Sequence, residues 1–168
     1  ECLTNNGGCD AHAACANTPG SRTCTCTAPY SGTGLVCQQP TWSIASTTGP
    51  GIRSLTTLAY DPIRKEVVLF GGDLSNGSYF QSTDDTWVWN GTSWTQKNVT
   101  GPSARTDHAM VYDSSRQRVV LFGGNAGNFI FLNDVWEWDG TSWTQRNTGS
   151  TRPRGRADAA VAYDSSRN

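Results

Sequence analysis

From residue 40 onward, short apolar runs alternate with polar stretches that contain glycine. The runs Val67-Val68-Leu69 and Val119-Val120-Leu121 are rich in β-branched residues, and each leads into Phe-Gly-Gly. Runs of this length and composition, bounded by turn residues, are typical of buried strands. The pattern therefore predicts that this part of the chain is built from β-strands.

A second pattern places alternating tryptophans ahead of a turn. Residues 85–94 read Asp-Thr-Trp-Val-Trp-Asn-Gly-Thr-Ser-Trp, and residues 134–143 read Asp-Val-Trp-Glu-Trp-Asp-Gly-Thr-Ser-Trp. Alternation followed by Asn-Gly or Asp-Gly and a further strand predicts a β-hairpin with a type I′ turn. Each segment therefore adds two strands to the prediction.

These elements recur with a period close to 50 residues. Tyr60, Tyr112 and Tyr163 are each followed by aspartate and lie 52 and 51 residues apart. Three further columns recur at fixed distances from these tyrosines: Pro50, Pro102 and Pro153; Arg53, Arg105 and Arg156; and Arg64, Arg116 and Arg167. Each unit reads as four short strands. The first ends at Tyr-Asp, the second ends at Phe-Gly-Gly, the third carries Trp-x-Trp, and the fourth begins at Ser-Trp. Four short strands are the content of one propeller blade.

The glycine pairs, the tyrosine and tryptophan columns and the strand order resemble kelch repeats over residues 41 to 168. The resemblance implies a partial kelch-type β-propeller with two complete blades and two partial ones. Residues 41–44 align with residues 93–96, so the region opens on a fourth strand, and it stops in the turn after the first strand of a third unit. Closed propellers have roughly four to eight blades, so we expect the remaining blades beyond residue 168.

Composition separates the first part of the chain from these repeats. All six cysteines lie within residues 1–37, and their spacers hold turn residues rather than apolar periodicity. Such a short segment cannot bury enough apolar surface to fold unaided, so disulfides must replace a core. Spacing alone does not choose among the possible pairings. Disulfides persist in oxidising compartments, so we predict a stapled module at residues 1–39, a second domain at residues 40–168, and an extracellular or cell-surface location.

The cysteine-rich segment resembles an EGF-like domain. The resemblance rests on Glu1-Cys2-Leu3-Thr4-Asn5-Asn6-Gly7-Gly8-Cys9, on Cys15-Ala16-Asn17-Thr18-Pro19-Gly20-Ser21 and on Cys24-Thr25-Cys26. The pairing of that family implies disulfides that join Cys2 to Cys15, Cys9 to Cys24, and Cys26 to Cys37. The fold class predicted for the whole chain is therefore all-β, with a small disulfide-rich EGF-like module ahead of the partial propeller.

The resemblance is closest to the calcium-binding subclass of EGF-like domains. That subclass has an acidic residue before the first cysteine and Asn or Asp two residues after the third, which supply the oxygen ligands that Ca²⁺ requires. Glu1 and Asn17 stand at these positions, whereas Arg22 stands where the subclass has an aromatic residue. The alternative is that Glu1 is an exposed terminus and Asn17 a turn residue.

Charge and motif content exclude several classes of function. Thirteen basic against 14 acidic residues give no attraction to nucleic acid or to anionic membranes. No apolar run approaches the roughly 20 residues that span a bilayer. The chain opens without an initiator methionine, so we expect it to be processed or to be part of a longer reading frame.

The sequence also shows no catalytic constellation. His12 and His108 are the only histidines, and neither has a second histidine or a downstream cysteine to complete a transition-metal site. Copper oxidases that share the kelch fold need a cysteine crosslinked to tyrosine, and no cysteine follows Cys37. We therefore predict no catalytic residue and no cofactor other than calcium in the EGF-like module.

Two sets of residues in the repeats are candidates for binding. Arg53, Arg105 and Arg156 recur once per blade and could contact acidic or carbonyl-bearing ligands; the favoured alternative is a structural ion pair repeated in every blade. The stretches 73–84 and 125–133 repeat least, and variable loops on a repeating scaffold commonly determine binding. The contact candidates in them are Tyr79, Phe80, Phe129, Ile130 and Phe131, which could equally cover a neighbouring blade.

These observations favour an extracellular binding or adhesion module that engages a protein or a glycan through its propeller loops. An alternative function is a non-catalytic or substrate-handling part of a larger secreted enzyme. A third possibility is a passive link in a longer array. Fold alone does not decide among them.

Overall fold

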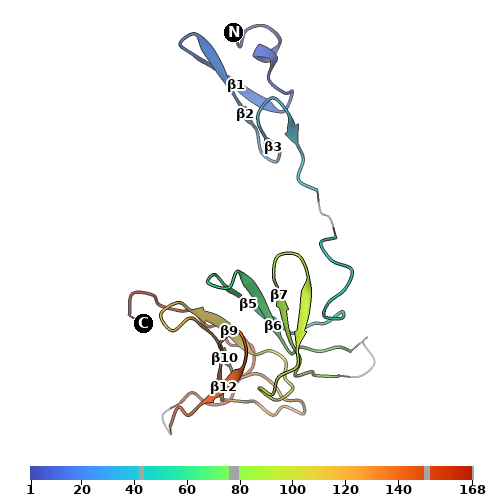
Figure 1. The fold of residues 1–168 in the computed structure, drawn as a ribbon, viewed down its shortest axis with the longest axis vertical. Coiled ribbons are helices and arrows are strands. Elements are labelled where there is room, and N and C mark those ends of the chain that lie inside the picture. The colour runs from blue at the N-terminus through green and yellow to red at the C-terminus, as the bar shows by residue number, and fades with distance from the viewer. Residues whose placement is uncertain (42–43, 76–79, 150–151, 168) are drawn as a thin grey trace. The chain divides into compact units, whose positions relative to one another are not determined.

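The computed structural model describes residues 1–41, 44–75, 80–149 and 152–167. The chain divides into two compact units, Glu1–Ile44 and Ala45–Asn168, which we call the EGF-like module and the kelch unit. Apart from one short 3₁₀ turn, the described elements are strands (Figure 1). The predicted all-β class is therefore confirmed.

The EGF-like module consists of small strand pairs held by disulfides. After the 3₁₀ turn η1 (Asn5–Gly8), the strands β1 (Ala13–Thr18) and β2 (Ser21–Cys26) form an antiparallel hairpin. Two short strands, β3 (Ser31–Gly32) and β4 (Cys37–Gln38), form a second pair. The disulfides join Cys2 to Cys15, Cys9 to Cys24 and Cys26 to Cys37. This is the pairing that the resemblance implies.

The kelch unit contains two four-stranded antiparallel sheets of the same topology. The first repeat is formed by β5 (Thr57–Asp61), β6 (Glu66–Phe70), β7 (Thr86–Trp89) and β8 (Trp94–Lys97). The second repeat is formed by β9 (Ala109–Asp113), β10 (Arg118–Phe122), β11 (Val135–Trp138) and β12 (Trp143–Arg146). In each sheet the strands lie in sequence order, so each is one up-and-down blade (Figure 1).

The register explains why the residue columns repeat. Met110 lies opposite Leu121, which lies opposite Trp136, on one face of the second repeat. Ala59 lies opposite Val68, which lies opposite Val88, on the facing side of the first repeat. These two faces pack together into one buried core that also includes Phe70, Val119, Trp138 and Trp143. We call this packing the inter-repeat interface.

The predicted hairpins form, but the predicted type I′ turn is wrong. Such a turn needs positive φ at both central residues, and of Asn90 and Gly91 only Gly91 has it, with φ of 95°. The connection spans residues 90–93, because Trp89 and Trp94 are already paired. The Asn90 side-chain oxygen accepts hydrogen bonds from the backbone N–H groups of Thr92 and Ser93, both at 2.9 Å. This side-chain turn replaces the two-residue turn.

The predicted first strand of the third repeat is not formed within residues 152–167. β5 and β9 each pair with the second strand of their own repeat, and the described residues of the third unit make no such pair. The segment nevertheless attaches to the second repeat, because Gly124 N–H donates to Arg156 C=O at 2.9 Å and Arg156 N–H donates to Leu132 C=O at 3.0 Å. The predicted opening strand falls on Trp42 and Ser43, which lie outside the described residues.

Candidate binding surface

The connection between β10 and β11 forms an ordered, projecting hairpin. Ala126 N–H donates to Ile130 C=O at 2.9 Å, Ile130 N–H donates to Gly127 C=O at 2.9 Å, and Asn125 pairs with Phe131 as an isolated bridge. The Asn125 side chain accepts a further hydrogen bond from Gly127 N–H at 2.9 Å. We call residues 126–131 the apolar tip. Its backbone contacts fix the positions from which its side chains project.

Three consecutive large apolar side chains project from this tip into solvent. Phe129, Ile130 and Phe131 are 84%, 58% and 48% exposed. Asn128 and Phe129 both have positive φ, 50° and 59°. Asn128 and Phe129 are the central residues of the turn closed by the hydrogen bond from Ile130 N–H to Gly127 C=O, and positive φ at both is the geometry of a type I′ turn. The tip therefore presents exposed apolar side chains from a defined hairpin turn.

The segment that contacts the tip carries arginines that the sequence analysis did not single out. At Gly155 a Cβ atom would be 2.1 Å from the carbonyl oxygen of Phe131, so the backbone at Gly155 packs directly against the tip. This segment carries the exposed Arg152 and Arg154. The sequence did distinguish these two positions. The residues equivalent to Arg152 and Arg154 are Gly49 and Gly51 in the first repeat, and Gly101 and Ser103 in the second.

The other two predicted contact residues lie in the connection between β6 and β7. Phe80 is 51% exposed, and Tyr79 lies outside the described residues. Asp73 holds the described part of this connection, since its carboxylate accepts hydrogen bonds from the backbone N–H groups of Ser75 at 3.0 Å and Gln81 at 2.8 Å. Hydrogen bonds from Ser75 and Gln81 keep the pKa of Asp73 below its usual range.

The first two arginines of the repeated column make ion pairs within their own repeats. Arg53 donates to both carboxylate oxygens of Asp85, at 2.8 and 3.0 Å, and Arg105 donates to both of Asp134, at 2.7 and 2.9 Å. Each arginine also donates to a backbone carbonyl, of Gly71 or Gly123, at 2.9 Å. Arg105 is completely buried. These contacts support the structural interpretation of Arg53 and Arg105.

The electrostatics of these pairs agree with that interpretation. Burial acts to raise the pKa of Asp134, but the hydrogen bonds and the charge of Arg105 outweigh it, so that the pKa lies below its usual range. Burial also acts to raise the pKa of Asp85, and the hydrogen bond and charge of Arg53 lower it below its usual range.

Arg156, the third arginine of this column, repeats one of its contacts. Its Nε donates to Arg154 C=O at 3.1 Å, as Arg105 Nε donates to Ser103 C=O at 2.9 Å.

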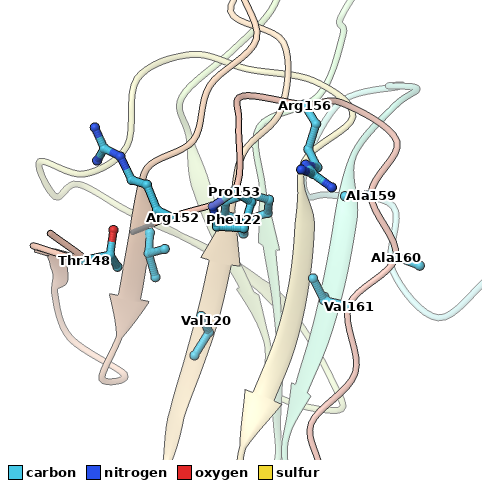
Figure 2. A pocket seen from close by; sticks show the side chains of 10 residues that line it. Val120, Phe122, Thr148, Arg152, Pro153, Arg156, Ala159, Ala160 and Val161 are labelled. Carbon is cyan, nitrogen blue, oxygen red and sulfur yellow. The ribbon is translucent and has the colours of Figure 1, made fainter. Parts of the chain in front are cut away.

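A cavity of about 450 Å³ lies over the outer face of the second repeat, the face that points away from the first. Its apolar floor includes Val120, Phe122 and Val135, and Val161 contributes from the third-repeat segment. Figure 2 shows Arg152 and Arg156 on either side of Phe122 in that view. The cavity therefore combines apolar surface with two cationic side chains.

The two histidines lie in different units, and each packs on an aromatic ring. His12 stacks on Tyr30 with ring centroids 3.8 Å apart, and His108 meets Phe70 edge-on at 5.6 Å. Burial, with a smaller contribution from the charge of Arg105, lowers the pKa of His108 to about 4. His108 is therefore a neutral packing residue at neutral pH.

The two candidate calcium ligands are brought together, but their oxygens already have other partners. Asn17 Oδ1 accepts hydrogen bonds from the backbone nitrogens of Glu1 and Cys2, both at 3.0 Å. The Glu1 carboxylate lies 3.8 Å from the guanidinium of Arg22. Ca²⁺ needs roughly six to eight oxygen ligands, and the described residues contain no group of three or more His, Cys, Asp or Glu placed to hold a metal. In this arrangement the residues do not fit a calcium ion.

The fold and the surface together define a repeat protein of the β-propeller class joined to a disulfide-stapled module. A family model described as the KLHDC2/KLHL20/DRC7 kelch-repeats domain matches residues 33–167, and an EGF domain model matches residues 2–37. The chain belongs to this kelch-repeat family. Both domain classes are typical of protein-interaction modules. The part of the chain that the structure describes contains no helix with the length and apolarity of a membrane span.

Proposed function

We propose that the chain is an extracellular, non-catalytic module that binds a protein partner through the apolar tip. The observation that carries this proposal is the run Phe129-Ile130-Phe131, exposed on a hydrogen-bonded hairpin with positive φ at Phe129. Contiguous exposed apolar side chains mark interaction sites more often than isolated ones. Three consecutive apolar side chains can be buried against apolar residues of a partner, which favours a protein over a glycan.

Two further features support the remaining parts of the proposal. Three disulfides in 37 residues suit an oxidising compartment, which supports an extracellular location. The buried His108 and Arg105 contact aromatic and carboxylate side chains of the fold itself. Their involvement in packing supports binding rather than catalysis.

The test compares two isoleucines at opposite ends of the strands. Ile130 in the tip and Ile63 in the turn between β5 and β6 are 58% and 59% exposed, so Ile130→Asn and Ile63→Asn remove equal apolar surface. A photo-reactive residue at position 92, in the turn at the Ile63 end, or at position 129 would be irradiated with extracellular protein extract. We expect a discrete adduct from position 129 alone, which excess wild-type chain competes away.

The matched variants then decide the outcome. Excess Ile63→Asn should compete as well as wild type, whereas Ile130→Asn should compete at least about tenfold less well, as expected for an apolar contact near the centre of an interface. Equal competition by the two variants, or the same adducts from positions 92 and 129, would show that the tip is not the contact site.

A further inference from the structure

We propose that Arg22 is the resident cation of the EGF-like module and takes the position at which the calcium-binding subclass would place its ion. The proposal concerns the stapled module alone and is independent of the apolar tip. It rests on three observations: the strand register that places Arg22 opposite Asn17, the glycine turn along which the Arg22 side chain lies, and the carboxylate that its guanidinium approaches.

Arg22 starts directly across the hairpin from the candidate calcium ligand. In the register of β1 and β2, Asn17 is paired with Arg22. Asn17 Oδ1 is occupied by the backbone nitrogens of Glu1 and Cys2, both at 3.0 Å. An amide oxygen has two lone pairs, so these two donors use its accepting capacity. The side chain that the calcium-binding pattern assigns to the metal instead holds the backbone of Glu1 and Cys2 against the hairpin.

The arginine side chain then crosses a turn that leaves room for it. A Cβ atom at Gly7 would lie 2.7 Å from Arg22 Cδ and 2.8 Å from Cys15 Sγ, and one at Gly8 would lie 3.2 Å from Arg22 Nη2. Both glycines have positive φ, 60° and 78°. Any larger residue at Gly7 would meet both the arginine and the disulfide. The path of Arg22 is therefore set by the packing of the turn.

The guanidinium of Arg22 lies beside the Glu1 carboxylate, and the module has few other acidic residues that could bind a cation. Glu1 and Asp10 are the only acidic residues in positions 1–44. Asp10 is committed to the backbone N–H groups of His12 at 2.8 Å and Cys37 at 3.1 Å. Glu1 therefore remains for a cation, and the Arg22 guanidinium lies 3.8 Å from it. A divalent ion placed on Glu1 would meet the positive charge of Arg22 at short range.

The decisive measurement is a CaCl₂ titration of the whole chain, followed through the backbone amide resonances of residues 2, 17 and 22, with NaCl of equal ionic strength as the reference. We expect no saturable change up to roughly 10⁻³ M, the weak end of extracellular calcium modules. Saturable binding to the wild-type chain within that range would overturn the proposal. A chain extended by one residue ahead of Glu1 replaces the terminal ammonium with an amide and should behave identically.

Two variants separate the charge of Arg22 from its packing. Arg22→Lys keeps the cation and should still exclude calcium. Arg22→Gln removes it and should strengthen calcium binding on the order of tenfold, the effect of a unit charge about 5 Å from a divalent ion in a water-like medium. The hairpin resonances of residues 13–16 check that both variants keep the fold. If Arg22→Gln and Arg22→Lys respond equally to calcium, the guanidinium is not what excludes the ion.

Discussion

The inter-repeat interface and the outer face of the second repeat are built from the same columns of residues, yet they differ in what covers them. Val68, Phe70 and Thr86 of the first repeat are buried, because strands of the second repeat pack on them. Their counterparts Val120, Phe122 and Val135 line a cavity and are only half-buried. Sequence columns therefore determine which face a side chain occupies, and the neighbouring repeat determines whether it is buried.

The covering side chains explain the difference. Trp143 closes the interface by donating its indole N–H to Thr86 Oγ1 at 2.9 Å and by meeting the Phe70 ring edge-on at 5.5 Å. Over the outer face, the segment of residues 152–167 contributes only the small side chains of Ala159 and Ala160 and the medium-sized side chain of Val161. The outer face also differs in charge, since Glu137 stands where the first repeat has Val88 and is paired with Arg116 and Arg146.

Removing the equivalent phenylalanines should give the largest contrast between the two faces. Phe70→Ala should cost about 3–5 kcal/mol of unfolding free energy, because it opens a cavity in a filled core. Phe122→Ala should cost only about 1–2 kcal/mol, because that ring already borders a cavity. Urea unfolding followed by tryptophan fluorescence measures both, since all seven tryptophans follow residue 41.

The wild-type chain and the exposed substitution Ile63→Asn serve as references for this pair. Ile63→Asn should change the unfolding free energy by less than about 0.5 kcal/mol. Equal losses for Phe70→Ala and Phe122→Ala would mean that another surface covers the outer face in solution.

Acid should weaken the inter-repeat interface through His108. In the unfolded chain this side chain has the ordinary histidine pKa of 6.5, and in the fold its pKa is about 4. Between these values the unfolded state binds a proton that the folded state does not. The contribution to stability is therefore complete above pH 6.5 and is lost progressively down to pH 4, by about 3 kcal/mol. Urea unfolding across this pH range measures the slope.

The control for this experiment replaces His108 with the residue of the first repeat in the same column, Thr56. His108→Thr lowers the overall stability but should remove the slope between pH 6.5 and 4. A slope that persists unchanged in the variant would assign it to other groups.

Exchanging one hydroxyl should give the smallest of the three effects. Thr86→Val leaves the buried Trp143 indole N–H without its acceptor and should cost about 1–2 kcal/mol. The reverse change in the second repeat, Val135→Thr, adds a hydroxyl at the cavity and should cost less than about 0.5 kcal/mol. Thermal unfolding of the two variants side by side measures the difference, and equal shifts would contradict the role of this hydrogen bond.

The strand content of both repeats was predictable because local patterns control it. Alternation, β-branched runs and Trp-x-Trp each lie within one strand, so the sequence shows them directly. The disulfide pairing followed from the EGF-like resemblance rather than from spacing. The turn at Asn90 was mispredicted because its side chain competes with the backbone for the N–H groups of Thr92 and Ser93.

The candidate site was only partly predictable from the sequence. Phe129 and Phe131 were found as apolar residues in a variable stretch, but their exposure depends on a hairpin whose hydrogen bonds the sequence does not show. Arg105 and its partner Asp134 are 29 residues apart, so no local pattern links them. The left-handed backbone shared by Leu55, Asp107 and Asp158 was also missed, because leucine rarely adopts it.

The attachment of Arg156 to the second repeat has a consequence for how such a chain is duplicated or shortened. Gly72 N–H donates to Arg105 C=O at 3.0 Å, just as Gly124 N–H donates to Arg156 C=O at 2.9 Å. Each sheet is thus completed by the segment that opens the following sequence unit, so folding units and sequence units are out of phase. A truncation for expression that ends at β12 would remove this closing segment, whereas one that ends after Asp158 would retain it. Gene duplications should likewise be tolerated best when their boundary follows the arginine rather than the last strand.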